Sequence, residues 1–131
     1  MADKAQRLQA RRARGLKARL SGRRQEVLAA VLLMLKGYRI LGFRLKTPEG
    51  EIDLLAQRGD VLAVVEVKSR STIEAALEAV SATQRTRLKR AARAIASRRS
   101  LRPNVRLDLV ALAPKSWPRH IPDAWREGSG S

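Results

Sequence analysis

The sequence predicts an α/β protein in which helices flank a mixed β-sheet. Apolar residues recur at helical spacing over residues 22–36, and three strand-like runs follow at 39–45, 51–56 and 61–68. A long helical segment at 82–98 precedes a fourth strand at 105–113, and this connection is long enough to join parallel strands. The expected order is helix, three strands, helix and strand, which is an αβββαβ core within one domain.

The first predicted helix has signals at both ends. Ser21 is a suitable N-cap, and Gly37 suits the position just after the last helical turn. Residues 46–50 are expected to form a turn after the first strand, and Gln57–Asp60 a tight turn between the second and third strands, which therefore form a hairpin. The apolar residues that define the helical period are Val27, Leu28, Val31, Leu32 and Leu35.

Two capping boxes mark the start of further helices. Ser71 with Glu74 predicts a short helix over residues 73–80, and Ser81 with Gln84 predicts the long helix over 82–98. Pro103 is expected to end the long helix. The chain therefore has a helical connection between its third and fourth strands.

The part of the chain that follows the fourth strand is rich in proline and tryptophan and is predicted to be irregular. Trp117 and Trp125 are expected to close a small core, and stacking of their rings on nucleic-acid bases is the alternative. Residues 127–131 are predicted to form a flexible tail, so the folded domain is expected to span residues 21–126.

The charge balance is strongly basic. The chain of 131 residues has 28 Lys and Arg against 12 Asp and Glu, a formal net charge of +16. Such a protein attracts polyanions, with nucleic acid as the first candidate and an anionic membrane surface as the second. Half of this net charge lies before residue 25, so residues 1–20 are predicted to be a flexible basic arm that becomes helical on a polyanion. A disordered tail that only aids solubility is the alternative.

Composition also limits the kinds of site that this chain can build. The sequence has no Cys and one His, so carboxylates must hold any metal, which favours Mg²⁺, Mn²⁺ or Ca²⁺. The longest apolar run, Val27–Leu35, is far shorter than the ~20 residues that a membrane-spanning helix needs. No signal peptide is recognised, so a cytoplasmic monomer or homodimer is expected, with an organelle transit peptide as a minor option.

Charged residues alternate along the predicted hairpin. If Ala56 pairs with Val61, four charged side chains share one face, and the opposed Glu51 and Glu66 repel each other. A divalent cation would relieve that repulsion, whereas a solvated hairpin with Lys68 paired to a glutamate is the alternative. The charged face contains Glu51, Asp53, Glu66 and Lys68, and the opposite, apolar face contains Ile52, Leu54, Ala56, Val61, Ala63, Val65 and Val67.

The same residues carry a family resemblance. Asp53 followed by Glu66-x-Lys68 resembles the PD-(D/E)xK motif of the restriction-endonuclease-like superfamily. More closely, Gly50–Ala56 and Val64–Arg70 resemble the YraN family of predicted nucleases, and the similarity covers residues 22–126. The resemblance implies a restriction-endonuclease-like mixed sheet flanked by helices, and a nuclease that uses Mg²⁺ or Mn²⁺ to cleave DNA, with branched and single-stranded forms as candidate substrates.

The resemblance also implies roles for individual residues. Asp53 and Glu66 would bind the metal, Lys68 would be the catalytic lysine, and Glu26 would be a third catalytic and metal-binding carboxylate from the first helix. An ordinary glutamate in a first helical turn is the alternative for Glu26. Glu51 is a possible accessory residue of the site.

In two places the sequence departs from the family pattern. The family usually has Lys-Gln early in the long helix where this chain has Gln84-Arg85, which weakens the accessory role predicted for Gln84. The connection from Arg70 to Glu78 is also short and lacks the usual glycine. His120 lies in a segment that resembles the family, and either structural hydrogen bonding or a general-base role is open to it.

Basic residues in two regions are predicted to bind nucleic acid, DNA rather than RNA. A non-catalytic DNA- or RNA-binding factor that retains the nuclease fold is the competing prediction, and a membrane-surface protein would leave the carboxylates unexplained. The predicted nucleic-acid-binding residues are Arg11, Arg12, Arg14, Lys17, Arg19, Arg23, Arg24, Arg70, Arg85, Arg87, Lys89 and Arg90.

Overall fold

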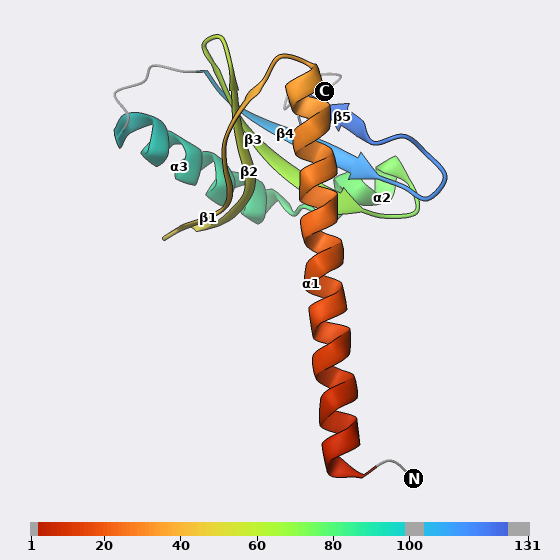
Figure 1. Cartoon of the computed structure of the whole chain (residues 1–131). Coiled ribbons are helices and arrows are strands. Elements are labelled where there is room, and N and C mark those ends of the chain that lie inside the picture. The colour runs from red at the N-terminus through yellow and green to blue at the C-terminus, as the bar shows by residue number, and fades with distance from the viewer. Residues whose placement is uncertain (1–2, 99–103, 126–131) are drawn as a thin grey trace.

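The computed structural model describes residues 3–98 and 104–125, with side chains for all of these except 16–22. Three helices and five strands follow one another along the described chain (Figure 1). The predicted C-terminal tail and the helix-ending Pro103 lie outside these residues. In chain order the elements are α1 (Lys4–Leu35), β1 (Arg39–Thr47), β2 (Gly50–Arg58), β3 (Val61–Ser69), α2 (Ile73–Glu78), α3 (Ala82–Arg98), β4 (Asn104–Leu112) and β5 (Arg119–Ile121).

The five strands form one mixed sheet in the order β1-β2-β3-β4-β5. All neighbouring strands are antiparallel except β3 and β4, which are parallel and joined through α2 and α3. This confirms the predicted mixed sheet with a helical crossover, an arrangement consistent with the restriction-endonuclease-like fold. The prediction of irregular structure after residue 113 is wrong for β5, because a strand of three residues that pairs only with β4 leaves no readable period.

Helix α1 is much longer than predicted. It begins at Lys4 rather than at residue 22, and Asp3 rather than Ser21 is its N-cap. The Asp3 side chain accepts a hydrogen bond from the Gln6 backbone N, and the Gln6 side chain accepts one from the Asp3 backbone N. The apolar period starts only at Val27, so the pattern did not reveal the preceding turns, which consist mainly of residues with high helix propensity.

The other helix ends agree more closely with the sequence. Gly37 follows α1 with a φ of 91°, as expected of a residue at this position. The Ser81 hydroxyl accepts a hydrogen bond from the Gln84 backbone N at the start of α3. At α2 the predicted cap is wrong by one residue, because Thr72 rather than Ser71 accepts the capping hydrogen bond.

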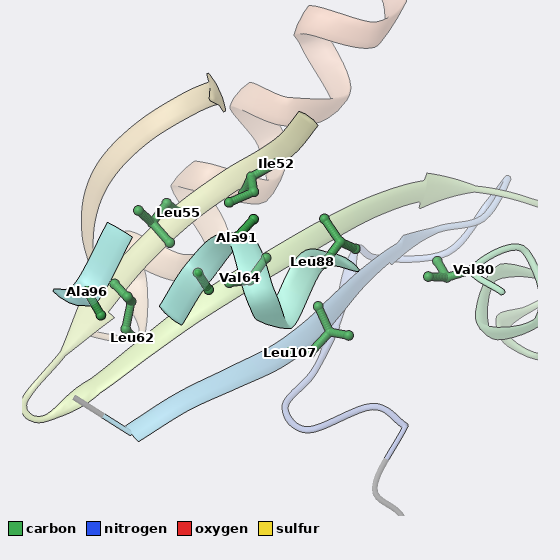
Figure 2. Packing of buried hydrophobic residues seen from close by; sticks show 10 residues of the cluster. Ile52, Leu55, Leu62, Val64, Val80, Leu88, Ala91, Ala96 and Leu107 are labelled. Atoms are coloured by element: carbon green, nitrogen blue, oxygen red, sulfur yellow. The ribbon is translucent and has the colours of Figure 1, made fainter. Parts of the chain in front are cut away.

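Both faces of the sheet are buried. On one face, sheet residues such as Leu55 and Val64 pack against α3 (Figure 2), and on the other, Leu54 and Val65 pack against α1. The predicted apolar face is correct for five residues of the α1 side, but Ile52 packs on the α3 side instead. Because helices cover both faces, the strands read as nearly continuous apolar runs. The five correctly grouped residues are Leu54, Ala56, Ala63, Val65 and Val67.

The register of the β2–β3 hairpin differs from the prediction by two residues. Ala56 pairs with Ala63 rather than Val61, since the turn consists only of Gly59 and Asp60 and Gly59 adopts a positive φ of 59°. Two-residue turns with positive φ favour tight hairpins. A shift of two residues keeps each side chain on its face, but it removes the predicted opposition of Glu51 and Glu66.

A buried polar network fixes the end of α1 against β4 and β5. The Arg106 guanidinium donates to both carboxylate oxygens of Asp108, at 2.7 and 2.8 Å, and also to the Tyr38 hydroxyl. His120 Nε2 lies 2.8 Å from Asp108 Oδ2, and His120 Nδ1 lies 2.6 Å from Lys36 Nζ. Both ring nitrogens of His120 are therefore within hydrogen-bond distance of a partner, which agrees with the prediction of structural hydrogen bonding for this residue.

Asp108 is the centre of this network, and its side chain is fully buried. Burial by itself raises the pKa of Asp108, but hydrogen bonds from His120, Arg106 and the backbone of Asp123 lower it overall. Asp108→Ala is expected to destabilise the protein by about 3–5 kcal/mol, because it leaves buried charge without a partner. Urea denaturation measures this loss. Asp60→Ala, which removes an exposed carboxylate, is the control, and equal losses in the two variants would contradict the central role of Asp108.

Among the described residues, no helix combines the length and apolar character that a membrane crossing requires. Although α1 has 32 residues, its N-terminal half is strongly basic.

Candidate active site

The predicted carboxylates and lysine come together near the C-terminal end of β3. Asp53 lies on β2, and Glu66 and Lys68 lie on β3. The Glu66 side chain is 2% exposed, and Lys68 Nζ lies 3.9 Å from Glu66 Oε2. Asp53 Oδ2 accepts a hydrogen bond of 3.0 Å from the Val67 backbone N. The structure therefore places three of the four predicted catalytic residues in one cluster.

The local backbone explains how Asp53 reaches β3. The pairing of β2 with β3 runs from Leu54 opposite Val65 to the hairpin turn. On the other side of this first pair, the Asp53 side chain, instead of a strand backbone, accepts the hydrogen bond from the Val67 N–H. Ile52 and Leu55 pack in the same core cluster although they are three residues apart, so the alternation of β2 breaks here. The hydrogen bond from Val67 thus holds the Asp53 carboxylate against β3, next to Glu66.

The electrostatics of the cluster centre on Glu66. Its pKa is raised to about 8, mainly by burial and also by the nearby Asp53 carboxylate, while Lys68 acts in the opposite direction. Glu66 Oε1 is buried without a hydrogen-bond partner, one of two such side-chain atoms among the described residues. A buried oxygen of this kind costs free energy unless another group satisfies it.

This donor set fits a hard divalent cation. Mg²⁺ prefers oxygen ligands and is commonly held by one or two carboxylates together with a substrate phosphate. Asp53 and Glu66 supply two carboxylates, and the unpartnered Oε1 of Glu66 is available as a ligand. Within residues 3–98 and 104–125, however, no three acidic or histidine side chains gather into a metal-binding group. The site therefore offers two protein carboxylates rather than three.

Glu26 is paired with an arginine that the sequence did not single out. Arg44 Nε donates to both carboxylate oxygens of Glu26, at 2.9 Å each. Arg44 lies on β1 between the pairs Phe43–Leu54 and Leu45–Ile52, close to Asp53 in sheet register, and has a positive φ of 49°. Such a backbone is uncommon for a non-glycine residue and leaves no sequence signal. The metal-binding role of Glu26 stays a prediction.

The two accessory residues lie on one cleft. Glu51 and Gln84 both line a cavity of about 400 Å³ between the β1–β2 turn and the start of α3. Glu51 is exposed and lies opposite Lys46 of β1 in the strand register. Arg87 also lines this cavity, so the cleft contains both signs of charge. The accessory roles stay predictions, but the structure brings both residues to the same place.

The predicted nucleic-acid-binding residues lie on α1 and on α3, except for Arg70, which follows β3. Arg85 lies over the Trp125 ring, 5.8 Å from its centroid, and Arg85 Nε is the second buried atom without a hydrogen-bond partner. Arg70 donates a hydrogen bond to the Ser69 carbonyl. The side chains of Lys17 and Arg19 lie outside the described set. The exposed members on the two helices are Arg11, Arg12, Arg14, Arg23, Arg24, Arg87 and Arg90, and Lys89 is partly buried.

The two tryptophans have different surroundings. Trp125 packs against the core and donates a hydrogen bond of 2.9 Å from Nε1 to the Leu77 carbonyl, which confirms the prediction that it closes the core. Trp117 is 93% exposed, so the same prediction is wrong for this residue. It follows the β4 strand in a loop, and nothing in its local sequence distinguishes it from Trp125.

The raised pKa of Glu66 predicts a pH-dependent stability for the metal-free protein. Because the folded state holds this proton more tightly, stability is fully present below about pH 4.5 and is lost as pH rises towards 8. Glu66→Gln, which cannot ionise, should melt higher than the wild type above pH 8, and the difference should shrink as pH falls to 5. Thermal melts in EDTA across this range measure the effect. Parallel curves for the two proteins would contradict the buried-carboxyl assignment.

Comparison with known proteins identifies the family. The profile of Uncharacterised protein family UPF0102 matches residues 25–112. A UPF0102 protein of Caulobacter vibrioides is 68% identical over 117 residues, covering 88% of this chain and 94% of that protein. UPF0102 proteins of Parvibaculum lavamentivorans and Methylorubrum extorquens are 51% and 46% identical, covering 87% and 95% of this chain and 87% and 93% of those proteins. The chain therefore belongs to the UPF0102 family, which is the YraN family that its motifs resemble.

Proposed function

We propose that this protein is a metal-dependent nuclease that hydrolyses phosphodiester bonds of DNA. The observation that carries the proposal is the Asp53–Glu66 pair, in which a buried carboxylate has an unpartnered oxygen beside a lysine. A cluster of acids in a chain of net charge +16 needs a compensating role, and a cation that also binds phosphate supplies one.

The residues of the cluster would divide the chemistry among them. Asp53 and Glu66 would hold Mg²⁺ or Mn²⁺, and such an ion polarises a phosphate and activates water when bound. Lys68, whose side chain is 22% exposed, is free to reach a phosphate oxygen or the attacking water and to stabilise developing negative charge. The hydrogen bond from the Val67 backbone orients the Asp53 carboxylate, which supports this role.

Glu26 has two routes into the reaction. It can rotate away from Arg44 to complete the metal site, or it can keep Arg44 in place beside the cluster. The Arg44 side chain is 34% exposed, so the pair with Glu26 is partly screened by solvent. Comparison of Glu26→Gln with Arg44→Gln separates the routes, because only the first is expected to weaken metal binding if Glu26 is a ligand.

A non-catalytic DNA- or RNA-binding factor is the second candidate. It is favoured by the exposed arginines of α1 and α3, which can bind phosphates without a metal. The basic helices would then provide the function, and the carboxylate pair would be a structural remnant. This candidate explains the net charge equally well but leaves the buried Glu66 oxygen without a role.

A nuclease panel separates the two candidates. Purified wild-type protein is incubated with duplex, single-stranded, flapped and four-way DNA, in Mg²⁺ or Mn²⁺ and in EDTA. The proposal expects cleavage of at least one substrate that requires the metal and is lost in Asp53→Asn, which still accepts the Val67 hydrogen bond. Binding without cleavage of any substrate would favour the second candidate, and cleavage that survives EDTA would contradict the metal site.

A further inference from the structure

Helix α1 runs past the candidate site and beyond the sheet. Near its C-terminal end, the Lys36 carbonyl accepts a hydrogen bond from Arg58 at the far end of β2. Ten residues earlier, Glu26 is paired with Arg44, which lies beside Asp53 in sheet register. From Lys36 towards Lys4 the helix therefore approaches the site end of the sheet and then leaves it, as Figure 1 shows.

The part of α1 that projects is long and exposed. From Glu26 back to Lys4 it covers about 33 Å at the α-helical rise of ~1.5 Å per residue. All described side chains before residue 16 are exposed. On the side of the helix that faces the sheet after Glu26, Ala29 and Leu33 are in contrast fully buried. The projecting half is thus anchored at one end, and its described side chains before residue 16 are exposed to solvent.

Four of the seven described basic side chains of this half form a stripe. Lys4, Arg7, Arg11 and Arg14 recur at intervals of three or four residues, which places them along one side of a helix. Arg11 lies about five helical turns before Ala29, so both point in nearly the same direction. Because Ala29 faces the sheet, the stripe lies on the side of α1 that faces the domain.

We propose that α1 is a rigid support for a DNA duplex that flanks the scissile phosphate, so that the substrate carries about one turn of duplex on one side of the cleavage point. The proposal rests on the proposed nuclease function and specifies its substrate class. The projecting length of about 33 Å corresponds to ~10 base pairs, or one turn of B-DNA. A straight row of charge favours a straight polyanion, and duplex DNA stays straight over far longer distances than this.

Gly15 gives a direct test of rigidity that leaves the charge unchanged. It lies within α1, and a Cβ added there meets no atom within 4 Å, so Gly15→Ala fits without strain and should strengthen the helix. Gly15→Pro removes a helical hydrogen bond and kinks or breaks the helix. The domain should stay folded in both variants, because Gly15 lies 11 residues before Glu26 and far from the core. Unchanged denaturation midpoints verify this.

Affinity is measured in EDTA, without cleavage, on junction DNA whose duplex flank varies from ~5 to ~20 base pairs. For the wild type and Gly15→Ala, affinity should rise until the flank reaches about one turn and then level off. For Gly15→Pro this rise should disappear, with affinity for the longest flank lower by ~10-fold. The same length dependence in Gly15→Pro and the wild type would overturn the proposal, since the segment would then act as a flexible basic tail.

Two further measurements decide the remaining outcomes. Arg11→Gln should lower the slope of log affinity against log salt by about 0.9, whereas Arg12→Gln, about 100° around the helix, should change it less. Equal effects of the two substitutions would overturn the one-sided stripe.

With flanks of single-stranded DNA, affinity should show no plateau at a length of one turn. An identical plateau would overturn the preference for duplex DNA. Because none of these assays requires cleavage, a failed nuclease panel and a failed support model give different results.

Discussion

Lys68→Ala is expected to lower single-turnover cleavage of DNA by about 10²-fold or more, while affinity for the same DNA falls only slightly. The variant removes one positive charge from 28 basic residues, so its contribution to non-specific binding is small. Lys68 Nζ lies next to Glu66 at the carboxylate pair, where negative charge would develop in the transition state of the proposed reaction. A contact made mainly in the transition state lowers the rate of the chemical step more than it lowers binding.

The control for Lys68 keeps most of its length and a hydrogen-bond donor but not its charge. Lys68→Gln should not restore cleavage if the ammonium group stabilises negative charge. Fluorescence binding and single-turnover cleavage are measured on one substrate for all three proteins. Equal losses of cleavage and of affinity would show that Lys68 only holds a phosphate.

Loss of either carboxylate is expected to abolish both cleavage and the stabilisation of the protein by metal. Mg²⁺ or Mn²⁺ that binds only the native state raises its melting temperature, and Asp53→Asn and Glu66→Gln should remove this shift. The amide variants are preferred to alanine because Asp53 also accepts the Val67 hydrogen bond, so alanine would disturb β3 as well as the metal site.

Glu49→Gln is a suitable control for the metal experiment, because Glu49 is exposed and lies on the β1–β2 turn rather than in the carboxylate pair. It should retain the full melting shift. A shift that survives in both Asp53→Asn and Glu66→Gln would place the metal elsewhere. Glu66→Gln also predicts higher stability at alkaline pH in EDTA, so its folding and metal-binding effects have opposite signs and are readily separated.

The candidate site was predicted as a set of residues but not as a geometry. Alternation along two neighbouring strands placed Asp53, Glu66 and Lys68 on one face, and the two-residue error in register did not alter that grouping, because side-chain direction repeats every second residue. The hydrogen bond from Val67 to Asp53 could not be predicted, since it arises where the strand pairing stops.

Contacts between residues that are far apart in the sequence also could not be predicted from local patterns. Arg44 and Glu26 are 18 residues apart, on different elements, and meet only because α1 packs across β1. The Asp108 network joins Tyr38, Arg106 and His120 from three separate parts of the chain. Local periodicity reports which side chains share a face, but it does not report which element lies opposite them.

The sequence by itself determined the α/β class, the positions of four strands and the long helix α3, and the identity of the carboxylates and lysine, because hydrophobic period, turn residues and a short motif are local properties. Only the tertiary structure decided how deeply Glu66 is buried, and hence the rise in its pKa, since desolvation depends on the packing of elements that are distant in sequence. It likewise decided that α1 continues unbroken to Lys4, because a basic helix without an apolar face has no period to read.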